Sequence, residues 1–152
     1  MPHYATERRV GHAAEEMYAL VADIERYPEF VPLCERLVVR ARQTDGIRTV
    51  IVADMTVGYA ALREAFTTRV TLDPGGLHVW AEYLEGPFRH LDSRWSFVPE
   101  TGANACLVSF SIDYEFRSRL LAAVMGSAFD RMFRKFAEAF EKRADAIYGK
   151  TP

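Results

Sequence analysis

The sequence predicts an α+β fold in which a strongly curved antiparallel sheet of about seven strands wraps around one long C-terminal helix. Apolar residues recur with a period of two across most of residues 35–116, which is typical of strands with one buried face. Turn signals interrupt this pattern at short intervals, so successive strands are expected to pair as hairpins. After Ser118 the apolar period becomes helical. A sheet and a helix that each carry one apolar face can bury those faces against each other.

Tyr4–Val10 reads as the first strand, and two short helical segments follow it. In the first segment the apolar residues share one helix face: Met17, Leu20, Val21 and Ile24. The second segment is bent, because Pro28 and Pro32 each disfavour helical geometry in the preceding residue. It carries more apolar side chains than a flat surface could bury together: Tyr27, Phe30, Val31 and Leu33. The segment therefore predicts a concave sheet beneath it, and with that a cavity for a ligand.

The strands of the sheet follow the bent segment as successive hairpins. The Asp45-Gly46 pair is a strong hairpin signal, and we expect Gly58 to break the strand that follows it. The last strand alternates most clearly, with an apolar residue at every second position from Cys106 to Phe116. The residues that alternate with them are polar from Ser109 to Glu115, so one face is buried and the other is solvated. The expected strands cover residues 35–44, 47–57, 62–72, 77–84, 88–98 and 106–116.

The C-terminal region is predicted to be one continuous helix from Ser118 to Tyr148, about 45 Å long at 1.5 Å per residue. Its apolar side chains form a broad stripe at helical spacing: Met125, Phe129, Met132, Phe133, Phe136 and Phe140. We expect this stripe to face the concave side of the sheet.

The composition indicates one ordinary domain over residues 1–150. A net charge of −2 and a pI near 6.1 argue against a protein that binds DNA by neutralising phosphates. Cys34 and Cys106 lack metal-ligand spacing and suggest a reducing compartment. No stretch resembles a signal peptide or approaches the ~20 apolar residues of a membrane span. We therefore expect a cytoplasmic protein whose contact with the cytoplasmic membrane, if present, is peripheral.

Four segments carry a family resemblance at matching separations: Leu20–Cys34, Phe66–Val70, Gly86–Phe97 and Phe110–Leu121. Together with the aromatic helix that follows them, they resemble the coenzyme Q-binding and polyketide cyclase branch of the START-domain superfamily. That superfamily is also described as helix-grip or Bet v 1-like, and the branch includes bacterial ribosome-association toxins. The resemblance implies a helix-grip fold with a hydrophobic tunnel between the C-terminal helix and the sheet.

The resemblance leaves three functions open. The first is a non-enzymatic lipid-binding protein that holds ubiquinone in the tunnel, as its chaperone or carrier in respiratory electron transport. The alternative is a toxin-like inhibitor of translation that binds the large ribosomal subunit, and the third is a polyketide cyclase or aromatase. The expected partners are accordingly a polyprenyl quinone, the inner membrane or the ribosome, and not DNA. Ubiquinone is expected as a bound ligand, with no cofactor and no metal.

The sequence contains no motif of a familiar catalytic or metal site, which favours binding over catalysis. We expect His12, near a helix start, to lie at the surface. Asp113 and Glu115 share one face of the last strand and could pair for acid–base work. Their neighbours on that face are serines, so a solvated outer surface is the favoured interpretation.

Trp95 is the first choice for a ligand contact, because its indole can cover a quinone ring and donate one hydrogen bond. A plain core role for Trp95 is equally open. The same two interpretations apply to the methionines of the last helix, whose flexible thioethers suit irregular apolar partners. The remaining candidate ligand contacts are Phe30, Val31, Leu37, Phe66, Phe97, Phe110, Ile112, Met125, Phe129 and Met132.

Two surfaces bear on membrane and ribosome contact. Gly58–Leu62 is a mildly apolar hairpin tip, and Leu120–Met125 opens the last helix directly after Arg117 and Arg119, an arrangement that suits an anionic membrane surface. Inward packing of the apolar residues is the competing interpretation. A basic excess after Phe116 would suit ribosomal RNA, although charges on the outer face of a helix are usually just solvated. Its cations are Arg117, Arg119, Arg131, Arg134, Lys135, Lys142, Arg143 and Lys150.

Overall fold

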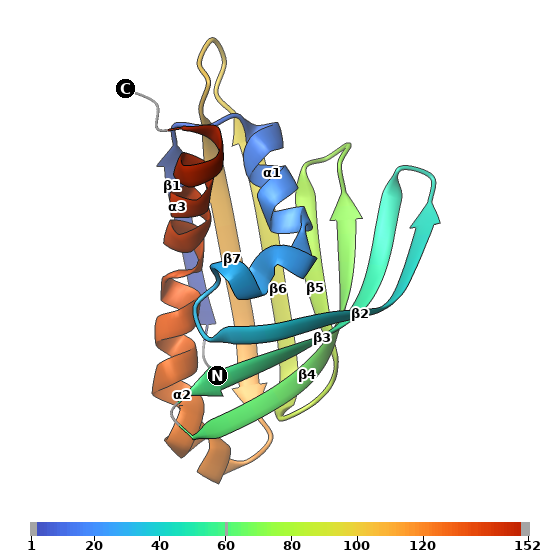
Figure 1. Cartoon of the computed structure of the whole chain (residues 1–152), viewed down its shortest axis with the longest axis vertical. Coiled ribbons are helices and arrows are strands. Elements are labelled where there is room, and N and C mark those ends of the chain that lie inside the picture. The colour runs from blue at the N-terminus through green and yellow to red at the C-terminus, as the bar shows by residue number, and fades with distance from the viewer. Residues whose placement is uncertain (1–2, 60, 150–152) are drawn as a thin grey trace.

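Seven strands follow one another through the chain in the computed structural model, which describes residues 3–59 and 61–149 (Figure 1). Three α-helices and one 3-10 helix accompany them within these residues. The elements are β1 (His3–Val10), α1 (Ala14–Ala22), the 3-10 helix η1 (Ile24–Glu29), β2 (Cys34–Asp45), β3 (Arg48–Tyr59), β4 (Leu62–Asp73), β5 (His78–Glu85), β6 (Phe88–Pro99), β7 (Cys106–Phe116), α2 (Arg119–Arg134) and α3 (Phe136–Tyr148).

The strands form one antiparallel sheet in the order β1-β7-β6-β5-β4-β3-β2. From β2 to β7, each strand pairs with the strand that follows it in the sequence. The first strand, β1, pairs with the last, β7. Figure 1 shows β2, β3 and β4 curving strongly across the view, with η1 beside them and α2 and α3 along the opposite side. The predicted α+β helix-grip fold is therefore confirmed, including the two short helices after the first strand.

The C-terminal region differs from the prediction of one continuous helix, because a turn at Lys135 divides it into α2 and α3. The amide of Lys135 donates to the carbonyls of Arg131 and Met132, which tightens the backbone at this point. Both helices contact the curved sheet. Phe129 of α2 packs 5.4 Å from the ring of Phe116, and Phe140 of α3 packs 5.1 Å from that of Trp95.

Gly58 does not break its strand, as the sequence led us to expect, but pairs with Arg63 inside the β3–β4 hairpin. An ion pair between Glu35 Oε1 and Arg63 Nε, 2.6 Å long, lies over this glycine. A Cβ atom at position 58 would come within 2.0 Å of Glu35 Oε2. The glycine therefore makes room for a contact between neighbouring side chains, and the strand continues past it.

One of the two bends around η1 lies elsewhere than the prolines suggested. Pro28 lies inside η1, and the first bend comes earlier, at Asp23, where the backbone leaves α1 with ψ 68°. The second bend begins at Val31, directly before Pro32 as expected, and continues to Leu33, whose φ of 63° is unusual for a residue with a side chain. Between these bends, Ile24 and Tyr27 are buried against the sheet.

Candidate functional site

A cavity of about 70 Å³ lies between the concave face of the sheet and the helices. Helical residues cover it from η1, α2 and α3, and the sheet supplies the rest of the wall. The lining contains no Asp, Glu, His, Lys or Arg among the described residues, and its only polar side chains carry hydroxyl groups. The lining residues are Ile24, Tyr27, Leu37, Ala53, Met55, Phe66, Thr68, Val70, Val79, Ala81, Leu91, Ser93, Ile112, Met132, Phe133 and Phe136.

Four of the residues expected to contact a ligand line this cavity together: Leu37, Phe66, Ile112 and Met132. They come from four different elements, β2, β4, β7 and α2, so they surround the space. The structure thus joins residues that are up to 95 positions apart in the sequence, Leu37 and Met132 being the extremes.

Trp95 lies outside the cavity lining, in an aromatic cluster next to it. Its ring centroid is 4.5 Å from that of Phe110 and 5.1 Å from that of Phe140, and it stacks on Phe97 at 6.2 Å. All of these side chains are at most 5% exposed. Trp95, Phe97 and Phe110 therefore occupy packed core positions.

The other expected ligand contacts also lie in packed regions beside the cavity. Phe30 packs its ring 5.0 Å from Phe140, and the Arg143 guanidinium lies 4.9 Å from its centroid on the outer side. Val31 is 4% exposed. Met125 and Phe129 are buried along α2, where the Phe129 ring lies 5.5 Å from that of Phe88.

Sequence reasoning missed most of the small residues that create the cavity. Ala53 on β3, Ala81 on β5 and Ser93 on β6 all face it. Ala81 pairs directly with Ser93 across β5 and β6, so two short side chains adjoin at the sheet surface. The available signal was a small residue at an inward position of a strand, where a large one would have met the helices.

The 3-10 helix η1 closes one side of the cavity with Ile24 and Tyr27. The Tyr27 hydroxyl donates to the backbone carbonyl of Val21, and burial raises the pKa of this phenol well above its ordinary value. The ring stays in place because both its apolar body and its hydroxyl have partners.

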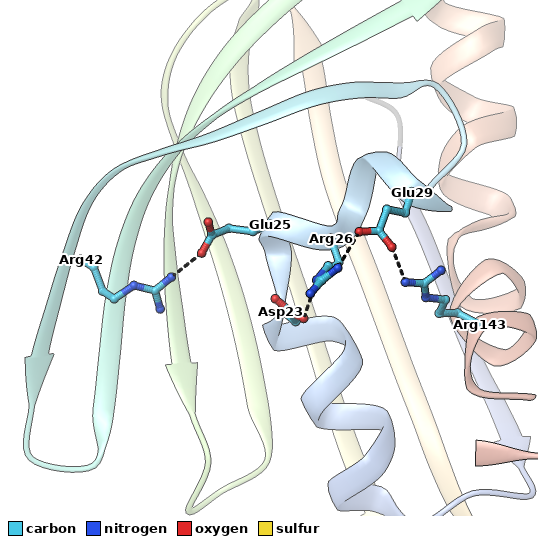
Figure 2. Close-up of polar contacts among 6 residues, drawn as sticks. All are labelled: Asp23, Glu25, Arg26, Glu29, Arg42 and Arg143. Atoms are coloured by element: carbon cyan, nitrogen blue, oxygen red, sulfur yellow. Dashed lines mark hydrogen bonds and ion pairs between the residues drawn. The ribbon is translucent and has the colours of Figure 1, made fainter. Parts of the chain in front are cut away.

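Charged side chains fasten η1 from the outside, as Figure 2 shows. Glu29 accepts from Arg143 of α3 at 2.6 Å and from Arg26 at 3.0 Å. These hydrogen bonds lower the pKa of Glu29. At the other end of η1, Glu25 accepts from Arg42 of β2 at 3.0 Å. The cavity cover is thus tied to a helix on one side and to the edge strand on the other.

A surface pocket of about 200 Å³ adjoins the cavity at Met132, which lines both. Its wall is formed by the turn before β2, the end of β3 and α2. Two cationic residues, Arg131 and Lys135, also line it. The Arg131 guanidinium lies 5.9 Å from the Tyr59 ring centroid. Met132 is therefore the side chain that lies between the cavity and the surface pocket.

The candidate acid–base residues lie away from the cavity. Asp113 contacts His3 at the exposed edge of the sheet, and Glu115 lies near Arg89 and His90. His12 is not at the surface, as we expected, but only 2% exposed, because α3 packs on α1 and brings Asp145 within 2.7 Å of its Nε2. Residues 3–59 and 61–149 contain no His, Cys, Asp and Glu cluster suited to a metal ion.

Several cations of the C-terminal helices are already paired. Arg134 contacts Asp130 at 2.9 Å, and Lys142 contacts Glu138 at 3.0 Å, both within one helix. Arg143 is engaged by Glu29. Lys150, the last of the predicted basic set, lies outside the described residues. Fewer of the basic side chains after Phe116 are therefore without a carboxylate neighbour than the sequence alone suggested.

The two predicted membrane-contact segments are partly exposed. Leu120 is 72% exposed at the start of α2, and Val124 is 43% exposed one turn later. In the hairpin tip, Tyr59 and Leu62 are exposed, whereas Ala60 lies outside the described residues. Within the described chain, none of the helices combines the length and the apolar character needed to span a bilayer.

Comparison with known proteins places this geometry in a family. A family model described as "Polyketide cyclase / dehydrase and lipid transport" matches residues 10–141. The mitochondrial coenzyme Q-binding protein COQ10 of Drosophila melanogaster is 35% identical over 140 residues, which are 90% of this chain and 56% of the relative. The chain thus spans a little over half of that protein. The ribosome association toxin RatA of Vibrio cholerae is 33% identical over 141 residues, which are 93% of this chain and 94% of the relative.

Solved structures agree with the fold. An 18 kDa protein from Caulobacter crescentus superposes with a TM-score of 0.79 at 32% identity, covering 98% of this chain and 99% of that one. An aromatase/cyclase from Streptomyces has a TM-score of 0.78 at 17% identity, covering 99% of both chains, and shows the fold alone. The matched residues 10–141 include every residue that lines the cavity, and on this basis the chain belongs to the polyketide cyclase / dehydrase and lipid transport family.

Proposed function

We propose that the protein binds ubiquinone or a similar polyprenyl quinone between its sheet and C-terminal helices, and that it carries this lipid for respiratory electron transport. The observation that supports the proposal most is the cavity between the sheet and the helices, whose lining is apolar apart from hydroxyl groups. Such a wall suits a neutral ring on a hydrocarbon tail. The similarity to coenzyme Q-binding relatives points to the same ligand class.

The ligand must open the cavity further than its resting size. An apolar cavity of about 150 Å³ is known to hold benzene, whereas this one measures about 70 Å³. Met55 and Met132 line it, and unbranched thioether side chains can change rotamer to make room. Movement of Met132 would also join the cavity to the surface pocket, which gives a long tail a path to the outside.

The energetics suit a carrier. Burial of each CH₂ group contributes ~0.8 kcal/mol relative to water, so a five-carbon isoprene unit contributes several kcal/mol. Relative to a bilayer the gain is small, because lipid tails are as apolar as the cavity. Loading and release can therefore stay close to balance. The exposed Leu120 and Val124 beside Arg117 and Arg119 supply a surface for peripheral contact with an anionic membrane during that exchange.

Ribosome binding is the second candidate function. It is favoured by relatives named ribosome association toxin, which this chain matches over 93% to 97% of its own length. Such binding would depend on contacts with phosphates and would weaken steeply with salt. The ion pairs of Arg134, Lys142 and Arg143 reduce the charge available for it.

Cyclisation of a polyketide is the third candidate and receives less support. A cyclase needs groups that donate and accept protons near the substrate. The described lining offers only the hydroxyls of Thr68, Ser93 and Tyr27, and the last of these is bonded to Val21. We therefore propose binding without catalysis.

Mass spectrometry of lipids that co-purify with the native protein tests the proposal, run beside sedimentation with ribosomes across a salt series. A bound polyprenyl quinone without salt-sensitive ribosome association is the expected result. An empty protein that sediments with the large subunit at low salt, and is released at high salt, would overturn the carrier function in favour of the second candidate.

A further inference from the structure

Two hydroxyl groups open into the otherwise apolar cavity, those of Thr68 on β4 and Ser93 on β6. Thr68 is only 9% exposed. Among the described residues, no hydrogen bond is made by either side-chain hydroxyl. Neither oxygen is among the fully buried polar atoms that lack a partner, so both keep some accessible surface and are free to bond a molecule in the cavity.

The neighbouring hydroxyls of Thr67 and Tyr27, in contrast, each have a hydrogen-bond partner. Thr67 points to the opposite face of β4, where its hydroxyl donates to Asp54 Oδ1 at 2.5 Å. Tyr27, which also lines the cavity, donates to the Val21 carbonyl. Thr68 and Ser93 are thus the described lining residues whose side-chain hydroxyls can still bond a ligand in the cavity.

The sheet register places these two hydroxyls around a gap. Ala81 of β5 pairs with Val70 of β4 on one side and with Ser93 of β6 on the other. Thr68 lies two residues before Val70 and so faces the same side of the sheet, diagonally across from Ala81. The short Ala81 side chain lies between the two hydroxyls, so a flat ring admitted when the cavity opens would have one hydroxyl toward each of two opposite edges.

We propose that Thr68 and Ser93 recognise the oxygen atoms of a ligand ring that enters the cavity first, each hydroxyl donating a hydrogen bond to a carbonyl or hydroxyl oxygen on the ring. The inference rests on the proposed quinone-carrier function and deepens it. The cavity selects a ring with oxygens on opposite edges, and the hydrocarbon tail trails toward Met132 and the surface pocket. A tail without an oxygenated ring leaves both hydroxyls unpaired and binds more weakly.

Isothermal titration with two probes tests this recognition. One probe is a ubiquinone with two isoprene units, and the other is geranylbenzene, which has the same tail on a ring without oxygen. The variants are Thr68→Val and Ser93→Ala, each of which removes a hydroxyl with little change in shape. Thr67→Val is the matched control, because it removes a threonine hydroxyl from the outer face of the same strand.

Each cavity variant should bind the ubiquinone about 2- to 12-fold more weakly, the range that the net contribution of one hydrogen bond gives. Binding of geranylbenzene should be unchanged, and Thr67→Val should bind both probes like the parent. Thr68→Val should also melt close to the parent when empty, because it removes a hydroxyl that bonds no other described residue and changes the shape of the side chain little. That result would separate recognition from a loss of fold.

Three results would overturn the inference. Equal weakening of both probes would assign Thr68 and Ser93 to packing alone. Unchanged ubiquinone binding in both cavity variants would show that the hydroxyls do not contact the ring, while leaving the proposed function in place. A parent protein that binds neither probe would remove the inference together with the carrier function, and this outcome is distinct from the other two.

Discussion

Nη2 of Arg143 lies 2.6 Å from Oε1 of Glu29 and so joins α3 to η1 across the outside of the cavity wall (Figure 2). On the inner side of the same wall, Ile24 and Tyr27 of η1 line the cavity. The ion pair therefore holds the cover that a ligand would have to displace or bypass.

Glu29→Gln should loosen this cover. The pKa of Glu29 is lowered from its ordinary value of 4.5 by hydrogen bonds from Arg143 and Arg26. The contribution of the carboxylate to stability is therefore present above pH 4.5 and is lost as the pH falls through the lowered value. The variant should melt slightly below the parent at neutral pH, and the difference should narrow under acid conditions. Thermal melting across pH measures this.

Glu138→Gln is the matched control for that experiment. Glu138 is also exposed and also has a pKa lowered by a cation, Lys142, but both residues belong to α3. This ion pair connects no two elements. Glu138→Gln should therefore leave the rate of ligand exchange unchanged, whereas Glu29→Gln should raise that rate. Equal exchange rates in the two variants would show that the Arg143–Glu29 pair does not control the cover.

Met132→Ala should make the ligand exchange faster. The truncation joins the cavity to the surface pocket, because Met132 lines both. It should also lower the free energy of unfolding by about 2 to 5 kcal/mol. Met125→Ala is the control, since Met125 is equally buried on α2 but lines neither space. Stopped-flow loading of a quinone should be accelerated by the first variant alone; equal acceleration by both would argue for general loosening.

Trp95→Ala should act on stability more than on affinity. The packing of Trp95 on Phe110 and Phe140, outside the cavity lining, predicts a loss of about 3 to 5 kcal/mol in the free energy of unfolding. Trp95→Phe should retain most of that stability and bind quinone like the parent. Urea denaturation and titration of the ligand separate the effects. A large loss of affinity in a Trp95→Phe protein that remains stable would restore Trp95 as a ligand contact.

Gly58→Ala and Gly86→Ala should differ in their effect on stability. At Gly58 a methyl group meets only the flexible ends of Glu35 and Arg63, so the expected cost is the exposed ion pair, about 0 to 1 kcal/mol. Gly86 has a φ of 141°, and its methyl group would lie 3.0 Å from the Phe66 Cα atom. The expected cost there is about 1 to 3 kcal/mol or more. Urea denaturation should rank them in this order; the reverse order would contradict the contacts.

The two thiols should be unreactive in the folded protein. Burial raises the pKa of Cys34 and of Cys106 to about 11, from an ordinary value of 9.0. Alkylation at pH 8 should therefore be slow in the native state and fast in urea. Because the folded values are raised, the associated stability is fully present below pH 9.0 and is lost as the pH rises toward 11. Rapid alkylation of the native chain would show that these residues are exposed by local opening.

The sequence predicted the elements best where one short-range pattern decides the structure. The Cys106–Phe116 strand has the bounds that its strict alternation predicts. Gly58 was missed because its contacts come from another strand, and the turn at Lys135 was missed because no glycine or proline marks it in the sequence. Gly58 lies beneath an ion pair between β2 and β4, and the turn is seen in the backbone hydrogen bonds of Lys135.

The cavity was harder to predict than the sheet around it. Alternation shows that Ile112 and Phe110 face the helices, but not that one borders a space while the other packs beneath Trp95. That difference depends on how far the helices stand from each strand, and on short residues such as Ala81. His12 shows the same limit, because its burial comes from Asp145, which is 133 positions away.

The edge strand β2 has consequences for how the protein behaves at high concentration. Its pairing with β3 shifts register twice, between Cys34 and Arg36 and between Val39 and Ala41. Irregular pairing and charged side chains along an edge, here Arg36, Arg40 and Arg42, discourage a second chain from adding a strand. If the protein carries a lipid, as proposed, it exposes apolar surface briefly whenever it loads or releases its cargo. An edge that resists strand addition protects it from aggregating during those intervals.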